Sequence, residues 1–361
     1  MPSRFHLLLF TGLAFVLISL FFLPFSRSTG NIDLSSPISY DKESHRPNGV
    51  IFILVSPKRI TQALMALYNV EDRFNRRLKY PYVLFTAADE ADAITAEIRE
   101  KVDYITEKRA TFAIVQPEAW GIPAGLDKSL VDESIHKIGF TIGYRSMCRF
   151  YSGFFWRHPA LAQYEWLWRL DSDIEFHCDI PYDPIERVIE QKGLYGFVQA
   201  SLDASWVQPT LASNVSRFLA SHASSLPPDA NHEFVWKGPE GAAKALMGSA
   251  GSDDWSGMTF YNNFEISHRS VWESGVYTKF FEALDNAGGF FYERWGDAPV
   301  HSYGLAMTLR KDQVVHLGDL GYQHQKWPYE CPIKLERCAC INDEAALSTS
   351  PPPPLDPKVN H

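Results

Sequence analysis

The chain has 361 residues, of which 45% are hydrophobic and 21% are charged, enough apolar material to build one large domain. Its formal net charge is -9, which excludes a surface that holds nucleic acid by neutralising phosphates. An anionic ligand therefore needs a local site. The ten tryptophans fit either a large aromatic core or surfaces on which sugar rings stack.

The first 47 residues predict a membrane anchor. Residues 7–26 contain no charged side chain and are mostly Leu, Phe, Val and Ile. About 20 helical residues at roughly 1.5 Å each span the roughly 30 Å hydrocarbon core. A cleaved signal peptide has a shorter apolar region followed by a small-x-small site, which is missing after residue 26. We expect a cytoplasmic tail over residues 1–6, an uncleaved transmembrane signal anchor over 7–26 and a stem over 27–47.

Strand and helix patterns alternate beyond the stem. Residues 50–55 predict a buried strand, residues 82–85 and 112–115 predict two further strands, and residues 60–78 and 91–101 predict helices between them. This alternation predicts crossover units, a mostly parallel sheet and an α/β fold class. Neither GxGxxG nor a GKS/GKT loop is present, which argues against a dinucleotide enzyme or a P-loop phosphotransferase. We expect one large catalytic domain over residues 48–345 and a disordered, proline-rich tail over 346–361.

A strand-like run from Tyr164 to Leu170 ends at Asp171-Ser172-Asp173. Side chains at i and i+2 of an extended chain face the same way, so Asp171 and Asp173 can hold one cation. Open α/β sheets bind ligands at the carboxyl ends of their strands. A nucleotide-sugar enzyme needs a divalent metal at such a place, because the departing diphosphate develops charge. Such a motif is weak evidence by itself, and many instances are surface turns.

The cysteines and one sequon suit a lumenal domain. The sequon begins at Asn214. An odd count leaves at least one thiol without a partner in the chain. The spacing near the carboxyl end favours disulfides, although a zinc site is the alternative; a second ligand pair at zinc-finger spacing is missing. The disulfide candidates are Cys148, Cys178, Cys331, Cys338 and Cys340.

Several longer motifs resemble the fungal α-1,2-mannosyltransferases of glycosyltransferase family 15. The most specific is the run from Gly288 to Ser302, GGFFYERWGDAPVHS. Similar blocks are YRSMCR at 144–149 with SGFFWRHP at 152–159, YNNFEI at 261–266, VEDRFN at 70–75 and GYQH at 321–324. The resemblance implies a type II Golgi membrane protein with a lumenal GT-A-like domain. It further implies GDP-mannose as donor, Mn²⁺ as cofactor, a mannosylated glycoprotein as acceptor and retention of anomeric configuration.

The resemblance also assigns roles to single residues. Asp171 and Asp173 stand where the family has Glu-Pro-Asp, and His324 matches its metal-binding histidine, an imidazole donor compatible with Mn²⁺. Glu265 matches the proposed nucleophile, and Tyr144 matches a tyrosine beside the donor sugar. The alternatives are that His324 is a solvated loop histidine and that Glu265 is a buried carboxylate paired with an arginine. A covalent intermediate and a same-face attack both remain open.

Further residues are candidates for binding donor or acceptor. Arg145 and Arg149 suit bidentate contacts with diphosphate, although a salt bridge is equally compatible with them. Arg59 lies where many relatives carry Arg-Asn. The segment 201–257 is longer than the resemblance leads us to expect, so acceptor choice is not transferred. The candidates for the acceptor or sugar pocket are Glu293, Trp295, Asp297 and His301.

These patterns favour an α-1,2-mannosyltransferase of the Golgi membrane. A non-catalytic lumenal lectin or scaffold on the same fold is one alternative, and a mannosylphosphate transferase is another. Intact carboxylates at Asp171, Asp173 and Glu265 favour the enzyme over the lectin.

Overall fold

The computed structural model describes residues 46–326, 331–332 and 337–340. The predicted anchor, nearly all of the stem and the proline-rich tail lie outside these residues. Among the described helices, none has the length and hydropathy that a membrane span requires.

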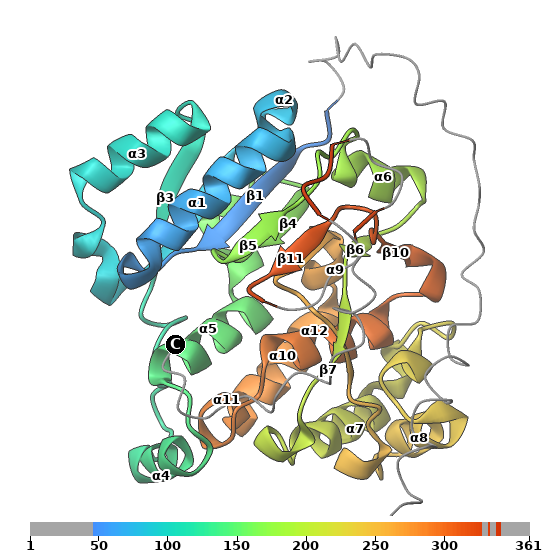
Figure 1. Cartoon of the computed structure of the whole chain (residues 1–361). Coiled ribbons are helices and arrows are strands. Elements are labelled where there is room, and N and C mark those ends of the chain that lie inside the picture. Colours follow the sequence, from blue (N-terminus) through green and yellow to red (C-terminus); the bar gives the residue numbers. More distant parts are fainter. Residues whose placement is uncertain (1–45, 327–330, 333–336, 341–361) are drawn as a thin grey trace, which may run out of the picture. The chain divides into compact units, whose positions relative to one another are not determined.

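A seven-stranded sheet forms the centre of the domain, in the order β10-β6-β9-β4-β1-β2-β3 (Figure 1). Strands β3, β2, β1 and β4 run parallel, as do β10 and β6. Only β9 is antiparallel to its neighbours, β4 and β6. This topology confirms the predicted α/β class with a mostly parallel sheet. The strands are β1 Gly49–Leu54, β2 Tyr82–Ala87, β3 Ala110–Val115, β4 Trp166–Leu170, β6 Tyr195–Phe197, β9 Phe264–His268 and β10 Val314–His316.

Helices cover both faces of this sheet. Alternate residues of β1 point to opposite faces: Ile51 and Ile53 pack with α1, α3 and α6, whereas Val50 and Phe52 pack with α5, α10 and α12. The helices are α1 Ile60–Val70, α2 Arg76–Leu78, α3 Ala96–Thr106, α4 Lys128–Ile138, α5 Ile142–Gly153, α6 Pro184–Glu190, α7 Leu211–His222, α8 Gly238–Leu246, α9 Ser270–Glu273, α10 Gly275–Ala287, α11 Gly289–Tyr292 and α12 Asp297–Thr308.

Two predicted helices differ in detail from the observed ones. The helix predicted over 60–78 is α1 and α2 joined by a π-helical turn, Glu71–Asn75. The helix predicted over 91–101 begins later, at Ala96. Thr95 sets this start because its hydroxyl accepts a hydrogen bond from the Ile98 N–H at 3.3 Å, which satisfies one of the free donors of the first turn.

Two small antiparallel sheets flank the central one. Strand β5, Ile174–Phe176, pairs with β11, Tyr322–His324. Strand β7, Ala200–Leu202, pairs with β8, Met258–Phe260. Helices α7 and α8 lie in the chain between β7 and β8, so the long segment noted in the sequence is an insertion that begins and ends at one small sheet.

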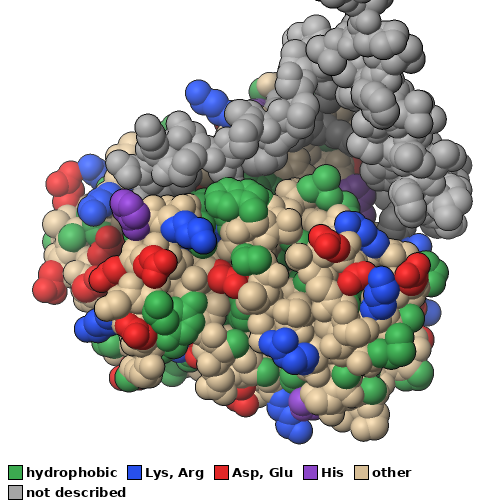
Figure 2. Space-filling view, turned by 90° about the horizontal axis from the view of Figure 1, so that it is seen from below, with side chains coloured by type: hydrophobic (Ala, Val, Ile, Leu, Met, Phe, Trp, Pro, Cys, Tyr) green, Lys and Arg blue, Asp and Glu red, His purple; other side chains and the backbone are tan. Residues whose placement is uncertain are grey.

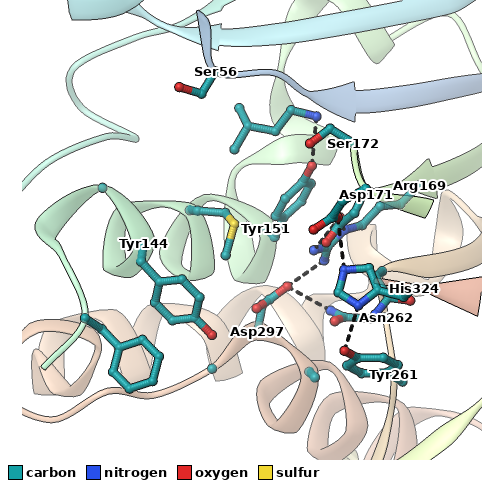
Figure 3. A pocket seen from close by; sticks show the side chains of 18 of the residues that line it. Ser56, Tyr144, Tyr151, Arg169, Asp171, Ser172, Tyr261, Asn262, Asp297 and His324 are labelled. Carbon is teal, nitrogen blue, oxygen red and sulfur yellow. Dashed lines mark hydrogen bonds and ion pairs between the residues drawn. The ribbon is translucent and has the colours of Figure 1, made fainter. Parts of the chain in front are cut away.

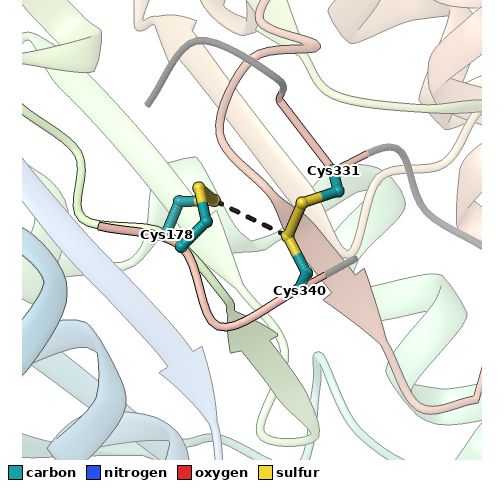
Figure 4. Close-up of side chains that lie close together, drawn as sticks. Cys178, Cys331 and Cys340 are labelled. Carbon is teal, nitrogen blue, oxygen red and sulfur yellow. Dashed lines mark hydrogen bonds between the residues drawn. A yellow bond between two sulfur atoms is a disulfide. The ribbon is translucent and has the colours of Figure 1, made fainter. Parts of the chain in front are cut away.

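The disulfide prediction is confirmed for four of the five cysteines. Cys178 is bonded to Cys338, and Cys331 to Cys340 (Figure 4). The four sulfur atoms lie within 4.8 Å of one another, but both bonds consume the thiolates that a zinc site would need. Cys148 is not a disulfide partner, contrary to its candidacy, because it is a buried free thiol on α5.

Candidate active site

A pocket of about 590 Å³ opens at the carboxyl ends of the parallel strands. Residues that follow β1, β2 and β4 line it, as expected for an open α/β sheet. Strand β9 contributes as well because it is antiparallel, so its amino end lies at this same edge. There the Asp171 N–H donates to the Asn263 carbonyl at 3.0 Å. Residues distant in the sequence therefore meet around the carboxylates that follow β4.

Three predicted metal ligands come together in this pocket. Donor atoms of Asp171, Asp173 and His324 lie within 4.8 Å of one another. Asp173 precedes β5 and His324 ends β11, and the pairing of these strands brings the His324 Nε2 atom to 3.0 Å from Asp173 Oδ1. The Tyr261 hydroxyl lies 2.8 Å from the other ring nitrogen of His324 (Figure 3). Two carboxylates and an imidazole form a donor set that suits Mn²⁺, and His324 is a buried strand residue instead of a solvated loop residue.

Asp173 is surrounded by donors. Arg59 Nη2 lies 2.6 Å and Gln325 Nε2 2.7 Å from its Oδ2 atom. Burial alone would raise the pKa of Asp173, but hydrogen bonding and charge from His324, with Gln325 and Arg59, hold the pKa well below its usual range. Arg59 lines the pocket, as predicted for a donor-binding residue. Its guanidinium contacts the Asp173 carboxylate, which is also a predicted cation ligand.

A buried arginine that the sequence analysis missed organises the pocket floor. Arg169 lies on β4, and its Nη1 donates to Asp297 at 2.5 Å while its Nε donates to Asp171 at 3.1 Å. The guanidinium carbon lies 3.5 Å from the centre of the Tyr151 ring. Asn262 also donates to Asp297, at 3.0 Å (Figure 3). Burial would raise the pKa of Asp297, but Arg169 and other donors lower it, whereas burial raises the pKa of Asp171.

Tyr144 lies on the wall formed by α5. Its hydroxyl accepts a hydrogen bond from Arg294 Nη1 at 3.3 Å, and burial raises its pKa well above the usual value. Arg294 also forms an internal ion pair with Asp203 at 3.2 Å. Tyr144, Arg294, Asp203 and Asp297 all line the pocket.

Two predicted diphosphate ligands are structural residues. Arg145 is fully buried and donates to the carbonyls of Phe291 and Gly139 at 2.8 Å each. Arg149 forms a bidentate ion pair with Asp285 at 2.6 and 2.8 Å. Neither residue lines the pocket. The donor-binding prediction is therefore wrong for both, and Arg149 forms the salt bridge that was its alternative.

Of the four residues predicted to form the sugar pocket, one lines the observed pocket and three do not. Asp297 lines the pocket, but Glu293, Trp295 and His301 do not. Trp295 is buried and donates its indole N–H to Glu293 at 2.7 Å. Glu293 also accepts from the Thr210 hydroxyl at 2.7 Å. These contacts fix the loop before α12. Burial contradicts the prediction of a sugar contact for Trp295 and His301, whereas for the partly exposed Glu293 it stays a prediction.

Glu265 lies beneath the pocket floor. It is 1% exposed and is not part of the pocket lining. Its Oε2 atom lies 2.9 Å from His301 Nδ1 and 3.1 Å from the Tyr195 hydroxyl. The other ring nitrogen of His301 lies 2.7 Å from the Tyr151 carbonyl. The alternative of a buried carboxylate is thus close to the observed geometry, but the partner is a histidine, not an arginine.

Comparison with known proteins places this geometry in a family. Residues 27–347 match the family described as glycolipid 2-alpha-mannosyltransferase. The chain belongs to this family. It is 34% identical over 327 residues to O-glycoside alpha-1,2-mannosyltransferase homolog 3 of Schizosaccharomyces pombe, covering 87% of this chain and 82% of that one.

Solved structures of related mannosyltransferases have the same fold. Core-mannan synthase A from Aspergillus fumigatus, in a form with Mn and GDP, superposes with a TM-score of 0.74 at 29% identity, covering 83% of this chain and 80% of that one. The mannosyltransferase Ktr4p from S. cerevisiae in complex with GDP gives a TM-score of 0.73 at 28% identity, covering 82% and 76%.

The surface of this mannosyltransferase agrees with its acidic composition. On the face shown in Figure 2, acidic and basic side chains are interspersed, and hydrophobic side chains form small groups. Among the described side chains visible on this face, no continuous basic area of the kind that binds a phosphate backbone is present.

Proposed function

We propose that this protein is a retaining α-1,2-mannosyltransferase that transfers mannose from GDP-mannose to a mannose-terminated glycan. One observation carries the proposal: in a chain of this family, Asp171, Asp173 and His324 converge at the carboxyl ends of a parallel sheet.

The pocket has room for a nucleotide at one end. Ser56, Ala87 and Glu90 follow β1 and β2 and form that end, where open α/β sheets hold nucleotides. A diphosphate extending from there reaches the metal ligands. Bound Mn²⁺ would neutralise the charge that develops on the departing GDP. Arg59 adds a cationic group at the same place.

The mannose then lies over the pocket floor. Tyr144 faces it from α5, and Asp297 is held by Arg169 and Asn262 with its charge retained. Asp297 is thus a fixed acceptor for sugar hydroxyls. Glu265 acts from below, through His301, on the position of this floor. Its assignment as nucleophile stays a prediction from the resemblance.

We further propose that the catalytic domain lies in the Golgi lumen behind the N-terminal anchor. Two disulfides support an oxidising compartment. Asn214 lies partly exposed on α7, and its glycosylation stays a prediction. Deleting residues 1–30 should release a secreted, active enzyme. Full-length protein that appears in the medium with a new N-terminus near Ser28 would contradict the anchor.

The test of the proposed activity uses the detergent-solubilised full chain with GDP-mannose, Mn²⁺ and a panel of mannosides. We expect release of GDP and a new α-1,2 linkage, identified by linkage analysis. Release of GMP with a phosphodiester product would identify mannosylphosphate transfer instead. Binding of mannosides without release of any nucleotide would identify a lectin.

A further inference from the structure

One wall of the pocket is formed by the end of β7 and by the first residue of the insertion between β7 and β8. Ser201, Leu202 and Asp203 line the pocket on this side. Leu202 is opposite Met258 in the β7–β8 pair, and the Asp203 N–H donates to the Gly257 carbonyl at 2.9 Å. The two ends of the insertion are therefore hydrogen-bonded to each other at the pocket, which gives the wall a defined backbone.

Asp203 presents a carboxylate whose orientation is fixed. Arg294 Nη2 lies 3.2 Å from its Oδ1, the Ala204 N–H lies 2.7 Å from the same atom, and Gln208 Nε2 lies 3.2 Å from its Oδ2. The side chain retains 18% exposure. A carboxylate held by three donors and still open to the pocket can accept hydrogen bonds from further hydroxyls.

Two large apolar side chains are exposed beside this carboxylate. Leu202 is 71% and Trp206 is 59% exposed. Residues on both sides of Trp206 in the chain contact Arg294. Asp203 pairs with Arg294, and the carbonyl of Val207, the next residue, accepts from the Arg294 N–H at 2.8 Å. The backbone of Trp206 is therefore held next to the wall that Asp203 and Arg294 form, although Trp206 is not itself a lining residue of the pocket.

In the donor placement proposed above, the nucleotide lies at the end formed by β1, β2 and β4, and the transferred sugar lies near Tyr144 and Asp297. Arg294 joins Tyr144 to Asp203, so the wall of Ser201–Asp203 lies beside that sugar position. We expect the acceptor hydroxyl to reach the anomeric carbon from this wall. A sugar combines an apolar face of C–H groups with an edge of hydroxyls, so an aromatic or aliphatic surface next to a carboxylate matches it.

We propose that Leu202, Asp203 and Trp206 form an acceptor platform that binds the second sugar of the acceptor, the unit next to the one that receives mannose. The enzyme is then selective for acceptors with at least two mannose units. This inference rests on the proposed function. In this proposal Trp206, and not the buried Trp295, is the aromatic residue that contacts the acceptor.

The test compares acceptors of one and two units on the full-length enzyme. Methyl α-mannoside and α-1,2-mannobiose are used at saturating GDP-mannose. We expect Trp206→Ala to lower kcat/KM for mannobiose about tenfold, the order of one aromatic contact, and to lower that for methyl α-mannoside less than about twofold. Trp206→Tyr should restore the mannobiose value. Met247→Ala is the matched control because Met247 is 70% exposed in the same insertion and is not part of the proposed platform.

Ligand-observed NMR gives a readout that does not depend on turnover. In saturation-transfer spectra, wild-type enzyme should saturate ring protons of both mannobiose units, and Trp206→Ala should lose the signal of the second unit. Equal losses for both acceptors, or a variant that handles mannobiose like wild type in rate and spectrum, would overturn the platform. Wild-type enzyme that shows the two-unit spectrum without transferring mannose supports the platform and contradicts the proposed function.

Discussion

The substitution Glu265→Gln separates two roles that the family motif and the geometry assign differently. A nucleophile must reach the anomeric carbon, whereas Glu265 is 1% exposed and faces His301 and Tyr195. Gln keeps the size and one acceptor oxygen but removes the charge. We therefore expect a loss of stability together with a moderate loss of activity, because the carboxylate supports the pocket floor from beneath.

The expected loss of stability follows from the two hydrogen-bond contacts of the Glu265 Oε2 atom. A hydrogen bond involving a charged group contributes about 1.5–3 kcal/mol, and Gln keeps a weaker form of each. We expect Glu265→Gln to lower the free energy of unfolding by roughly 1–3 kcal/mol. In a domain of this size each kcal/mol corresponds to roughly 2 °C, so the melting temperature should fall by about 2–6 °C. Removing the side chain in Glu265→Ala leaves buried donors unpaired and should cost roughly 3–5 kcal/mol. The kcat of Glu265→Gln should fall roughly tenfold, which corresponds to about 1.4 kcal/mol.

The assay measures melting temperature and initial rate on the same purified sample. Glu71→Gln is the matched control, since Glu71 is also 1% exposed and pairs with Arg109 at 2.5 Å, away from the pocket. It should lower the melting temperature by a similar amount without changing kcat. A Glu265→Gln enzyme that melts like wild type but loses two decades or more of kcat would refute the positioning role and identify Glu265 as a group that acts on the sugar.

Three further predictions follow from other parts of the structure. His324→Ala should abolish measurable Mn²⁺ binding in calorimetry and lower kcat at least about a hundredfold without lowering the melting temperature of the metal-free protein, because it removes a metal ligand; unchanged Mn²⁺ affinity would contradict the site. Replacing Cys178 and Cys338 together by Ser opens a cross-link between residues 160 positions apart and should cost about 2–5 kcal/mol of stability; an unchanged denaturation midpoint would refute this. Gly289→Ala would place a Cβ atom 2.0 Å from the Trp295 ring and should destabilise the fold by about 1–3 kcal/mol, whereas wild-type melting would show that the ring moves at little cost.

The fold was largely predictable because its signals are local. The apolar runs over 50–55, 82–85 and 112–115 each form a strand, and the helical patterns between them imply the parallel pairing that is observed. The antiparallel placement of β9 was not predictable in this way. Its pairing with β4 and β6 joins segments that no local pattern connects, and long-range contacts of this kind decide strand order.

The site was predictable only where spacing carries the information. Asp171 and Asp173 follow from the i, i+2 geometry at a strand end, whereas His324 came from the resemblance alone. Arg169 had a signal that was overlooked, namely a charged residue in an apolar strand two positions before Asp171. Arg145 and Trp295 were assigned to ligands although they are structural, because a family motif contains residues that hold a loop as well as residues that bind.

The antiparallel strand β9 explains why the candidate site behaves as one unit. Glu265 is opposite Arg169 in the pairing of β9 with β4, and the segment before β9 supplies Asn262, which donates to Asp297. Arg169 in turn contacts both Asp297 and Asp171. A displacement beneath the floor at Glu265 is therefore transmitted through β9 and Arg169 to a metal ligand. Because the coupling runs through buried, hydrogen-bonded groups, losses of activity and of stability should accompany each other at these positions, whereas Trp206→Ala, at an exposed side chain of the β7–β8 insertion, should change acceptor use alone.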